Sequence, residues 1–244
     1  MKTLTEPDLT MPRRKPRSFV ISLAYRFMRI ARTLFGAKSV LRFFLNTAWL
    51  AWRFAFELSS DVFGSAFQTD ARGISDELLG EFIPPGATVL DAGCGPGRWT
   101  RIAARHAAHV TGVDASPVVI EQARRDTAEG NVEYVVGDVR DVIARRHFDV
   151  ALLIHVLEHI DDPDAFLRMM SAAAGVLVIE VPNFEADALN PVRQSLGCRY
   201  YTDADHVREY TPSILREQLL RNDLELVRET QNRGSIIAVA RRRG

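Results

Sequence analysis

The sequence predicts an α/β protein built on a doubly wound, mostly parallel β-sheet, and two observations carry this prediction. From residue 88 onward, short β-rich runs alternate with helical segments, which is typical of a parallel sheet with helices on both faces. The first run leads into glycines at Gly93, Gly95 and Gly97, as expected where a strand turns sharply toward a ligand. The 244 residues suffice for one such core and a smaller appendage.

Seven strands are expected in this region, each short and rich in β-branched or other apolar residues. They are residues 88–92, 109–113, 132–136, 148–154, 176–181, 224–230 and 236–241. Helices are expected at residues 98–107, 117–128, 164–173 and 211–222. Thr211 precedes Pro212 in the last of these, which predicts an N-cap followed by proline at the first helical position. A turn at residues 232–234 predicts a hairpin between the last two strands.

The first 84 residues follow a different pattern. Residues 1–17 are rich in Pro, Thr and Arg, which predicts a disordered basic tail. Residues 18–35 place apolar side chains three and four positions apart, which predicts an amphipathic helix that Gly36 ends. Residues 40–58 are apolar nearly all round and contain several aromatic side chains. We therefore expect a tail at 1–17, a helical extension or lid at 18–84, and the main domain at 85–244.

The formal net charge of zero conceals two oppositely charged parts of the chain. Residues 1–53 contain 11 basic and two acidic side chains, a net charge of +9. The other 191 residues contain 20 basic and 29 acidic side chains, a net charge of −9. A basic arm on an acidic body indicates contact with a polyanionic surface such as lipid head groups, or docking within the chain. Nucleic acid is not expected as a partner, because the main domain is acidic.

We expect the protein to lie in the cytoplasm. We also expect residues 18–58 to make peripheral contact with a membrane. Two cysteines, Cys94 and Cys198, are too few for a disulfide framework of the secreted type. No apolar run reaches the roughly 18–20 residues of a transmembrane helix. The N-terminal apolar stretch is interrupted by arginines, unlike a secretion signal. The aromatic segment at residues 40–58 offers a surface on which two copies of the chain could pair.

Acidic residues follow three successive strands of the expected sheet. Asp91 comes directly before the glycine cluster, where its carboxylate could face a cationic group of a ligand. Asp114 ends the second strand about 20 residues later, where an acid can accept hydrogen bonds from both hydroxyls of a ribose. Asp138 follows the third strand and could accept a hydrogen bond from an adenine amino group. Each alone fits a cap or turn residue equally well, but three at one sheet edge favour a nucleoside site.

The segments that contain Asp91, Asp114 and Asp138 resemble the successive motifs of class I S-adenosylmethionine-dependent methyltransferases. The resemblance covers about residues 85–241 and is nearest to the ubiquinone-type and the glycan or natural-product O-methyltransferases, through the run H-V-L-E-H-I at residues 155–160. It implies a Rossmann-like sheet of seven strands whose last strand is antiparallel. It also implies S-adenosylmethionine as the cofactor, held by residues of the glycine loop and the following strand ends. The implied contacts are Asp91, Gly93, Cys94, Gly95, Gly97, Asp114, Ala115, Asp138, Val139 and His155.

Methyl transfer to a hydroxyl would need a general base, and histidine is the usual choice. His155 is one candidate, because it follows the fourth strand and by resemblance faces the reacting methyl group. His206 is the other, because it lies in the long segment at residues 182–210 that shapes the acceptor pocket in such enzymes. A structural hydrogen-bonding role for His206 is the alternative. The expected acceptor contacts are Asn183, Arg193, Tyr200, Tyr201, Arg208 and Tyr210. The acceptor itself is expected to be a small molecule, a sugar or a lipid-linked hydroxyl.

Other readings of the same residues are less consistent with the whole sequence. His155, Glu158 and His159 also spell an inverted zinc-peptidase motif, but His155 follows a strand, so the helical spacing is not expected. Some quinone-type relatives bind a divalent metal here, but they carry an acid at the position of His155, so no metal is expected. A nicotinamide-dependent oxidoreductase would use a different glycine pattern. A catalytically inactive scaffold of the same fold is a further alternative.

Overall fold

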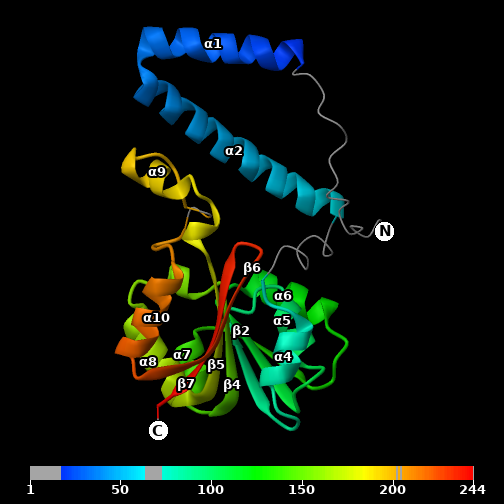
Figure 1. Ribbon diagram of the computed structural model, residues 1–244. Helices are drawn as coiled ribbons and strands as arrows, with labels where there is room; N and C mark the ends of the chain where they lie inside the picture. The colour runs from blue at the N-terminus through cyan, green and yellow to red at the C-terminus, as the bar shows by residue number, and fades with distance from the viewer. Residues whose placement is uncertain (1–17, 64–72, 202, 204, 244) are drawn as a thin grey trace. The chain divides into compact units, whose positions relative to one another are not determined.

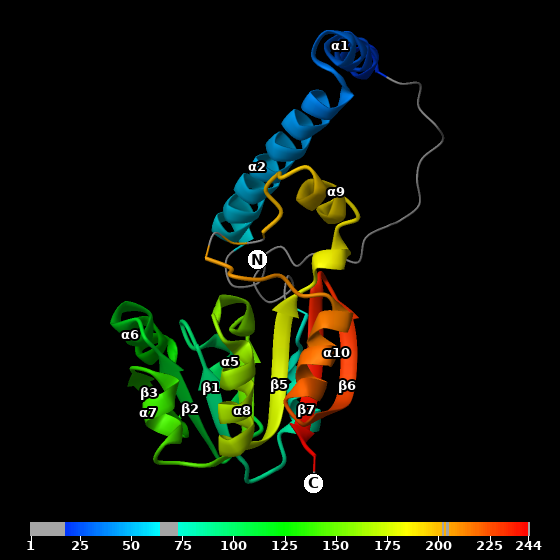
Figure 2. The ribbon, with the colours of Figure 1, turned by 90° about the vertical axis from the view of Figure 1, so that its left-hand side faces the viewer.

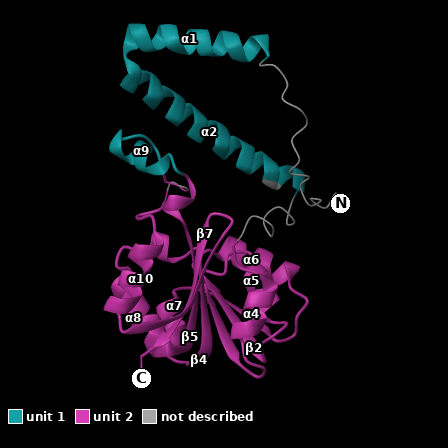
Figure 3. Ribbon diagram, in the orientation of Figure 1, with its two compact units in different colours: residues 1–71, 188–200 teal, residues 72–187, 201–244 magenta. Residues whose placement is uncertain are grey.

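The computed structural model of the chain describes residues 18–63, 73–201, 203 and 205–243 (Figure 1). The chain divides into two compact units (Figure 3). We call residues 72–187 with 201–244 the sheet unit, and residues 1–71 with 188–200 the helical unit. The disordered tail expected at residues 1–17 lies outside the described residues.

The sheet unit is built on seven strands in the order β3-β2-β1-β4-β5-β7-β6 (Figure 2). Strands β1 to β5 pair in parallel, whereas β7 runs antiparallel to both of its neighbours. The strands are β1 (Thr88–Ala92), β2 (His109–Asp114), β3 (Val132–Val136), β4 (Phe148–Ile154), β5 (Ala174–Pro182), β6 (Leu224–Asn232) and β7 (Ser235–Arg242). The expected Rossmann-like fold with an antiparallel last strand is confirmed. Strand order reverses between β1 and β4, which is where open α/β sheets bind ligands.

Helices cover both faces of this sheet (Figure 1). One face carries α4 (Asp76–Phe82), α5 (Arg98–Ala103) and α6 (Pro117–Asp126), and the other carries α7 (Val139–Ile143), α8 (Pro163–Ala173) and α10 (Pro212–Arg221). Two short 3₁₀ helices, η1 (Leu157–His159) and η2 (Phe184–Ala186), follow β4 and β5. Strand β4 shows why both faces must be covered, because Leu152 points into the α4–α5 core and Leu153 into the α8–α10 core.

Two helix ends show how local bonding decides the boundaries. Thr211 accepts a hydrogen bond of 3.2 Å from the amide of Ile214, so the expected N-cap of α10 is confirmed. The helix expected at 98–107 ends earlier, at Ala103. The amides of Arg105 and His106 there bond three residues back, a tight turn that stops the α-helix.

The sequence predicted that the main domain starts at residue 85, but the sheet unit begins earlier. Helix α4 is capped by Ser75, which accepts from the amide of Leu78 at 3.2 Å. Leu79 is fully buried, and with Ile74 and Ile83 it belongs to the core that covers one face of the sheet. The difference arises because α4 lies upstream of the first strand, so strand alternation gives no signal for it.

The helical unit contains α1 (Phe19–Phe35), α2 (Ala37–Phe63) and α9 (Asn190–Ser195). Gly36 separates the first two helices with a φ of 80°, as its place in the sequence predicted. The segment after α9 packs on α2: the amide of Arg199 donates to Asn46 Oδ1 at 3.3 Å, and the Arg199 guanidinium lies 5.3 Å from the Trp49 ring centroid. Among the described residues, no helix has the length and apolar character needed to cross a membrane.

Candidate functional site

The glycine loop joins β1 to α5, and its three glycines all have positive φ angles: 69° at Gly93, 50° at Gly95 and 74° at Gly97. A Cβ on Gly97 would lie 2.0 Å from Tyr134 Oη, so no side chain fits there. A Cβ on Gly95 would meet no described atom within 4 Å, so this residue borders open space. The loop therefore needs glycine for its conformation and leaves its backbone open to a ligand at Gly95.

Asp91 lies at the end of β1 with only 2% of its surface exposed. Its Oδ2 accepts a hydrogen bond of 2.6 Å from the Thr100 hydroxyl on α5. Burial raises the pKa of Asp91 to about 7 against the opposing effect of that bond, and the charge of Asp114 adds to the increase. A cationic group placed beside this carboxyl would favour its ionised form. Asp91 can therefore respond to a cationic ligand by losing a proton.

Asp114 connects the glycine loop to the turn that follows β2. Its Oδ2 accepts from the amide of Gly95 at 3.0 Å, and its Oδ1 accepts from the amide of Ser116 at 2.9 Å. A carboxylate offers about four acceptor positions, so both oxygens retain capacity for hydroxyl donors of a ligand. The neighbouring Ala115 is exposed at the same edge. This carboxylate thus orders two backbone segments beside the open space at Gly95.

Asp138 and Cys94 were expected to contact a cofactor, and in the structure both make contacts within the protein. Asp138 caps α7 through the amide of Arg140 at 2.8 Å and pairs with the Arg140 guanidinium at 2.5 Å, which holds the pKa of the carboxyl below its usual range. A ligand at Asp138 and Val139 would have to share that carboxylate with Arg140. The Cys94 thiol is buried against Tyr134, so it fills the core. Burial raises the pKa of this thiol.

His155 follows β4 with a φ of 55°, a conformation that is uncommon outside glycine and often found at functional sites. Its Nδ1 lies 3.0 Å from Glu158 Oε1 and its Nε2 lies 3.3 Å from Glu180 Oε1. Both carboxylates are fully buried. A neutral imidazole has one N–H, so the ring can donate to both carboxylates at once only in its protonated form. Contacts on both ring nitrogens leave neither nitrogen open to an acceptor hydroxyl, which favours a positioning role over that of a base.

Glu180 connects His155 to the start of the sheet unit. Its Oε1 also accepts from the amide of Gly73 at 2.9 Å, and its Oε2 accepts from the amide of Ile74 at 3.3 Å. Burial would raise the pKa of Glu180, but hydrogen bonds and the charge of His155 outweigh it and hold the pKa below the usual value. His155 and Glu180 therefore attach the start of the sheet unit to β5.

His206 is paired with a buried acid that the sequence reasoning did not single out. Its Nδ1 lies 3.0 Å from Glu209 Oε1, and both side chains are nearly buried, at 5% and 6% exposure. Burial would lower the pKa of His206, but the bond and charge of Glu209 outweigh it and raise the pKa. An imidazole oriented by a carboxylate is the usual arrangement of a histidine base.

Glu158, His159 and His206 form a group whose ligand-type atoms lie within 4.8 Å of one another. Glu158 Oε2 is buried and has no hydrogen-bond partner among the described residues. The rings of His159 and His206 meet edge to face with centroids 4.8 Å apart. The carbonyl of Glu158 also accepts from the amide of Val207 at 2.9 Å, which joins η1 to the His206 segment. Carboxylate and imidazole donors so arranged fit a divalent cation.

The six expected acceptor contacts are divided between the two units. Arg193 and Tyr200 belong to the helical unit, whereas the other four belong to the sheet unit. Asn183 caps η2 and donates to Gln231 Oε1 at 3.1 Å. Tyr201 is 37% exposed, and Arg208 donates to the carbonyl of Asp161 at 3.2 Å. Tyr210 is fully buried, with its hydroxyl 3.0 Å from Gln218 Oε1, so the structure makes it a core residue.

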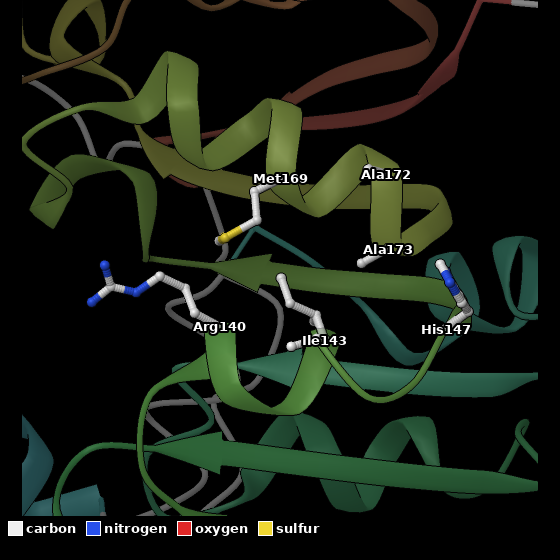
Figure 4. Close-up of a pocket in the computed structure, with 7 residues that line it drawn as sticks. Arg140, Ile143, His147, Met169, Ala172 and Ala173 are labelled. Carbon is white, nitrogen blue, oxygen red and sulfur yellow. The ribbon is translucent and has the colours of Figure 1, made fainter.

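Two surface hollows lie elsewhere on the sheet unit. One of about 300 Å³ lies between α7 and α8 and is lined by Arg140, Ile143, Ala144, His147, Met169, Ala172 and Ala173 (Figure 4). The other, of about 360 Å³, lies beside η2 and the β6–β7 turn and includes Asn183. Neither contains a residue of the glycine loop, so the candidate site is defined by backbone geometry and charge.

Three residues of the site carried no strong signal in the sequence. Thr100, Glu180 and Glu209 become informative only when the fold brings them to Asp91, His155 and His206. Thr100 lies in the first turn after the glycine loop, where a hydroxyl can turn back to the strand end. Glu180 was an anomaly that could have been noticed, because it is an acid within an otherwise apolar central strand.

Comparison with known protein families matches residues 66–229 to the family described as "Methyltransferase domain". Over 97 residues the chain is 40% identical to "Ubiquinone biosynthesis O-methyltransferase" of Xanthomonas campestris pv. campestris (strain B100), covering 38% of this chain and 41% of that protein. Over 87 residues it is 40% identical to the mitochondrial protein of that name from Schizosaccharomyces pombe, covering 34% and 32%. The chain thus matches about two fifths or less of the length of these curated relatives.

Solved structures are similar to this fold. The magnesium protoporphyrin IX methyltransferase of Synechocystis PCC 6803 with bound SAH has a TM-score of 0.58 at 21% identity, covering 84% of this chain and all of that one. An S-adenosylmethionine-dependent methyltransferase from Clostridium acetobutylicum has a TM-score of 0.56 at 12% identity, covering 80% of this chain and all of that one. At these identities the likeness establishes the fold.

Proposed function

Because the chain belongs to the methyltransferase domain family, we propose that it is an enzyme that transfers the methyl group of S-adenosylmethionine to a hydroxyl of a small or lipid-linked organic acceptor. The observation that carries this proposal is the bridge made by Asp114, whose carboxylate holds both the Gly95 and the Ser116 amides. That bridge orders the backbone on both sides of the open space at Gly95, where a nucleoside could bind. The relatives named for ubiquinone biosynthesis support a hydroxylated acceptor.

The cofactor would lie along the C-terminal ends of β1, β2 and β3. In this arrangement Asp114 would accept hydrogen bonds from the ribose, and Asp91 would hold the ammonium group of the methionine part. The open backbone at Gly95 lets the cofactor approach closely. Asp138 and Val139 would contact the adenine, with Arg140 moving aside or sharing the carboxylate.

The reaction is an in-line displacement in which the acceptor oxygen bonds to the methyl carbon and sulfur leaves as a neutral thioether. Alignment of the two reactants supplies much of the acceleration. The hydroxyl proton must also leave, and His206 would take it while Glu209 fixes the orientation of the ring. His155 would act as a positioning residue, because its ring is engaged by Glu158 and Glu180. The proton on His206 then passes to solvent.

The acceptor side would be formed by the segment that follows β5. We retain Asn183, Tyr201 and Arg208 of the sheet unit as proposed acceptor contacts and omit Tyr210, which is fully buried. Arg208 supports this role, since its Nε is buried without a hydrogen-bond partner among the described residues. A buried guanidinium nitrogen of this kind can bind an oxygen of the acceptor.

Binding of a divalent cation is a second proposed role for His206 and its neighbours. Glu158, His159 and His206 would hold it, and Glu158 Oε2 supports this use because no described residue bonds to it. A bound cation would polarise the acceptor hydroxyl and lower its pKa. Metal removal separates the two uses. The base role leaves turnover unchanged after treatment with EDTA, whereas a cation role predicts a loss that added Mg²⁺ or Zn²⁺ restores.

Contacts beyond the site are also proposals. The two cysteines are both free, which supports the reducing cytoplasm as the compartment. The exposed aromatic side chains of α2, such as Phe43 and Trp52, offer a surface for a second copy of the chain. We also propose peripheral contact with a membrane through residues 18–58.

The experiment that tests the function is a transfer assay with S-adenosylmethionine labelled on its methyl group. The purified protein is incubated with phenolic quinone precursors, sugars and lipid-linked hydroxyl compounds. We expect label in the ether of at least one hydroxylated acceptor, and we expect no transfer when that hydroxyl is absent. Label that appears on nitrogen or carbon of every active acceptor would contradict O-methylation. Cofactor binding without transfer to any of them would favour an inactive scaffold.

A further inference from the structure

We infer that α1 is an interfacial anchor that inserts an apolar stripe into a lipid surface and binds anionic head groups with its arginines. This inference concerns the helical unit alone and does not depend on the chemistry of the sheet unit. The stripe comprises Phe19, Leu23, Phe27, Ile30 and Leu34.

Helix α1 has no buried residue along its 17 positions. The stripe residues recur at spacings of three and four, so they lie on one face of the helix. Their exposed fractions range from 46% at Leu23 to 81% at Phe19. Folded chains rarely leave so many large apolar side chains contiguous and uncovered unless they meet a partner.

Contact with α2 leaves the stripe uncovered. Only Met28 and Ala31 of α1 are partly shielded. At 100° per residue Ala31 lies beside the stripe and Met28 lies nearly opposite it, so the shielded side of α1 is not the stripe. The remaining apolar arc therefore needs another occupant.

Charge identifies that occupant as an anionic surface. At 100° per residue Arg26 borders the stripe, whereas Arg29 and Arg32 lie on the polar arc away from it, and α1 contains no acidic residue. A broad apolar face with cationic residues on the polar face is typical of helices that lie in the plane of a membrane interface. Arginine side chains at the border can keep their stems in the apolar layer and their guanidinium groups among phosphates.

A second copy of the chain fits this helix less well. Pairing two α1 stripes would place Arg26 of each copy at the edge of the shared interface, with no acid on either helix to balance the two charges. Repulsion between like charges opposes such a pair, whereas anionic lipids add about 1 kcal/mol of attraction per basic residue. The adjoining α2 extends the same character, since Phe43, Phe44 and Trp52 are exposed beside Arg42.

The test is co-sedimentation of the full chain with vesicles of phosphatidylglycerol and with vesicles of phosphatidylcholine. We expect binding to phosphatidylglycerol vesicles that falls as salt is raised, and much weaker binding to phosphatidylcholine. The triple variant Arg26→Gln, Arg29→Gln, Arg32→Gln should bind at least about tenfold more weakly. Its matched control, Arg125→Gln, Arg145→Gln, Arg243→Gln, removes the same charge from exposed sites of the sheet unit and should bind as the wild type does.

A second pair of variants tests insertion of the stripe. Phe27→Ser with Ile30→Ser should lower binding about tenfold or more, while Ile214→Ser with Leu220→Ser, which changes exposed residues of α10, should not. Circular dichroism and S-adenosylhomocysteine affinity report whether each variant is folded. Equal binding to both kinds of vesicle, no binding to either, or concentration-dependent dimers that the Phe27 and Ile30 changes abolish would overturn the inference.

Discussion

The hydroxyl of Thr100 donates a hydrogen bond of 2.6 Å to the buried carboxyl of Asp91, at the point where the glycine loop leaves the sheet. This bond joins the end of β1 to the first turn of α5. It opposes the effect of burial, which still raises the pKa of Asp91 to about 7. Asp91 therefore changes its protonation state within the physiological pH range.

Cofactor affinity should consequently depend on pH. An ammonium group beside Asp91 lowers its pKa in the complex, so binding below about pH 7 releases a proton. Affinity for S-adenosylhomocysteine should weaken about tenfold for each unit of pH below that value and level off above it. Asp91→Asn should bind more weakly than the wild type above about pH 7 and lose the dependence on pH. Isothermal titration in buffers of different ionisation enthalpy measures the affinity and the number of protons released on binding. A wild-type affinity that is constant from about pH 5.5 to about pH 8 would contradict the role of Asp91.

The glycine loop gives a prediction about both stability and binding. Gly97→Ala places a methyl group against Tyr134 in a backbone conformation with a φ of 74°. We expect a loss of about 1–3 kcal/mol in the free energy of unfolding and a loss of cofactor binding. Gly130→Ala is the control, because a Cβ there meets no described atom within 4 Å. Urea unfolding of the two variants decides the matter, and equal stabilities would be evidence against a strained loop.

The pair of His206 and Glu209 predicts the pH profile of turnover. His206 acts as a base only when unprotonated, so kcat/KM should rise with pH through a pKa above the usual value for histidine. Glu209→Gln should move this limb to lower pH and lower the plateau about tenfold to a hundredfold. His206→Ala should lower turnover more strongly while leaving S-adenosylhomocysteine affinity unchanged. Turnover that survives His206→Ala unchanged would return this histidine to a structural role.

The contacts of His155 predict a large effect on stability. Its ring lies between Glu158 and Glu180, which are both fully buried. His155→Ala leaves these carboxylates without their cation and should lower the free energy of unfolding by about 3–5 kcal/mol. His147→Ala, at an exposed position, is the control and should change it by less than about 0.5 kcal/mol. If the two substitutions have similar effects in urea unfolding, the charge of His155 is not what holds this cluster.

The sheet was predictable from the sequence because its central strands are buried on both faces. Such strands read as apolar runs, and the alternation of these runs with helices fixes their parallel order. Glycines 93, 95 and 97 were predictable because positive φ angles favour glycine. Asp114 was predictable because the end of a second strand beside a glycine loop is a recurring position for an acid.

The polar partners could not be predicted, because they depend on distances across the fold. Tyr210 follows a polar segment and reads as a pocket residue, yet Gln218 gives its hydroxyl a buried partner. His155 reads as a base from its position, and only the fold shows that its ring lies between two buried carboxylates. The grouping of α9 with α1 and α2 was also missed, because more than 120 residues separate these helices in the sequence.

The central claim is that the loop from Asp91 to Gly97, with Asp114, forms an S-adenosylmethionine site. Calorimetric titration of the purified protein with S-adenosylhomocysteine tests it most directly, with NADH and NADPH as controls and Asp114→Ala as the matched variant. The account predicts saturable binding of S-adenosylhomocysteine alone, and none by Asp114→Ala. Binding of a dinucleotide in its place, or affinity of Asp114→Ala equal to that of the wild type, would contradict it.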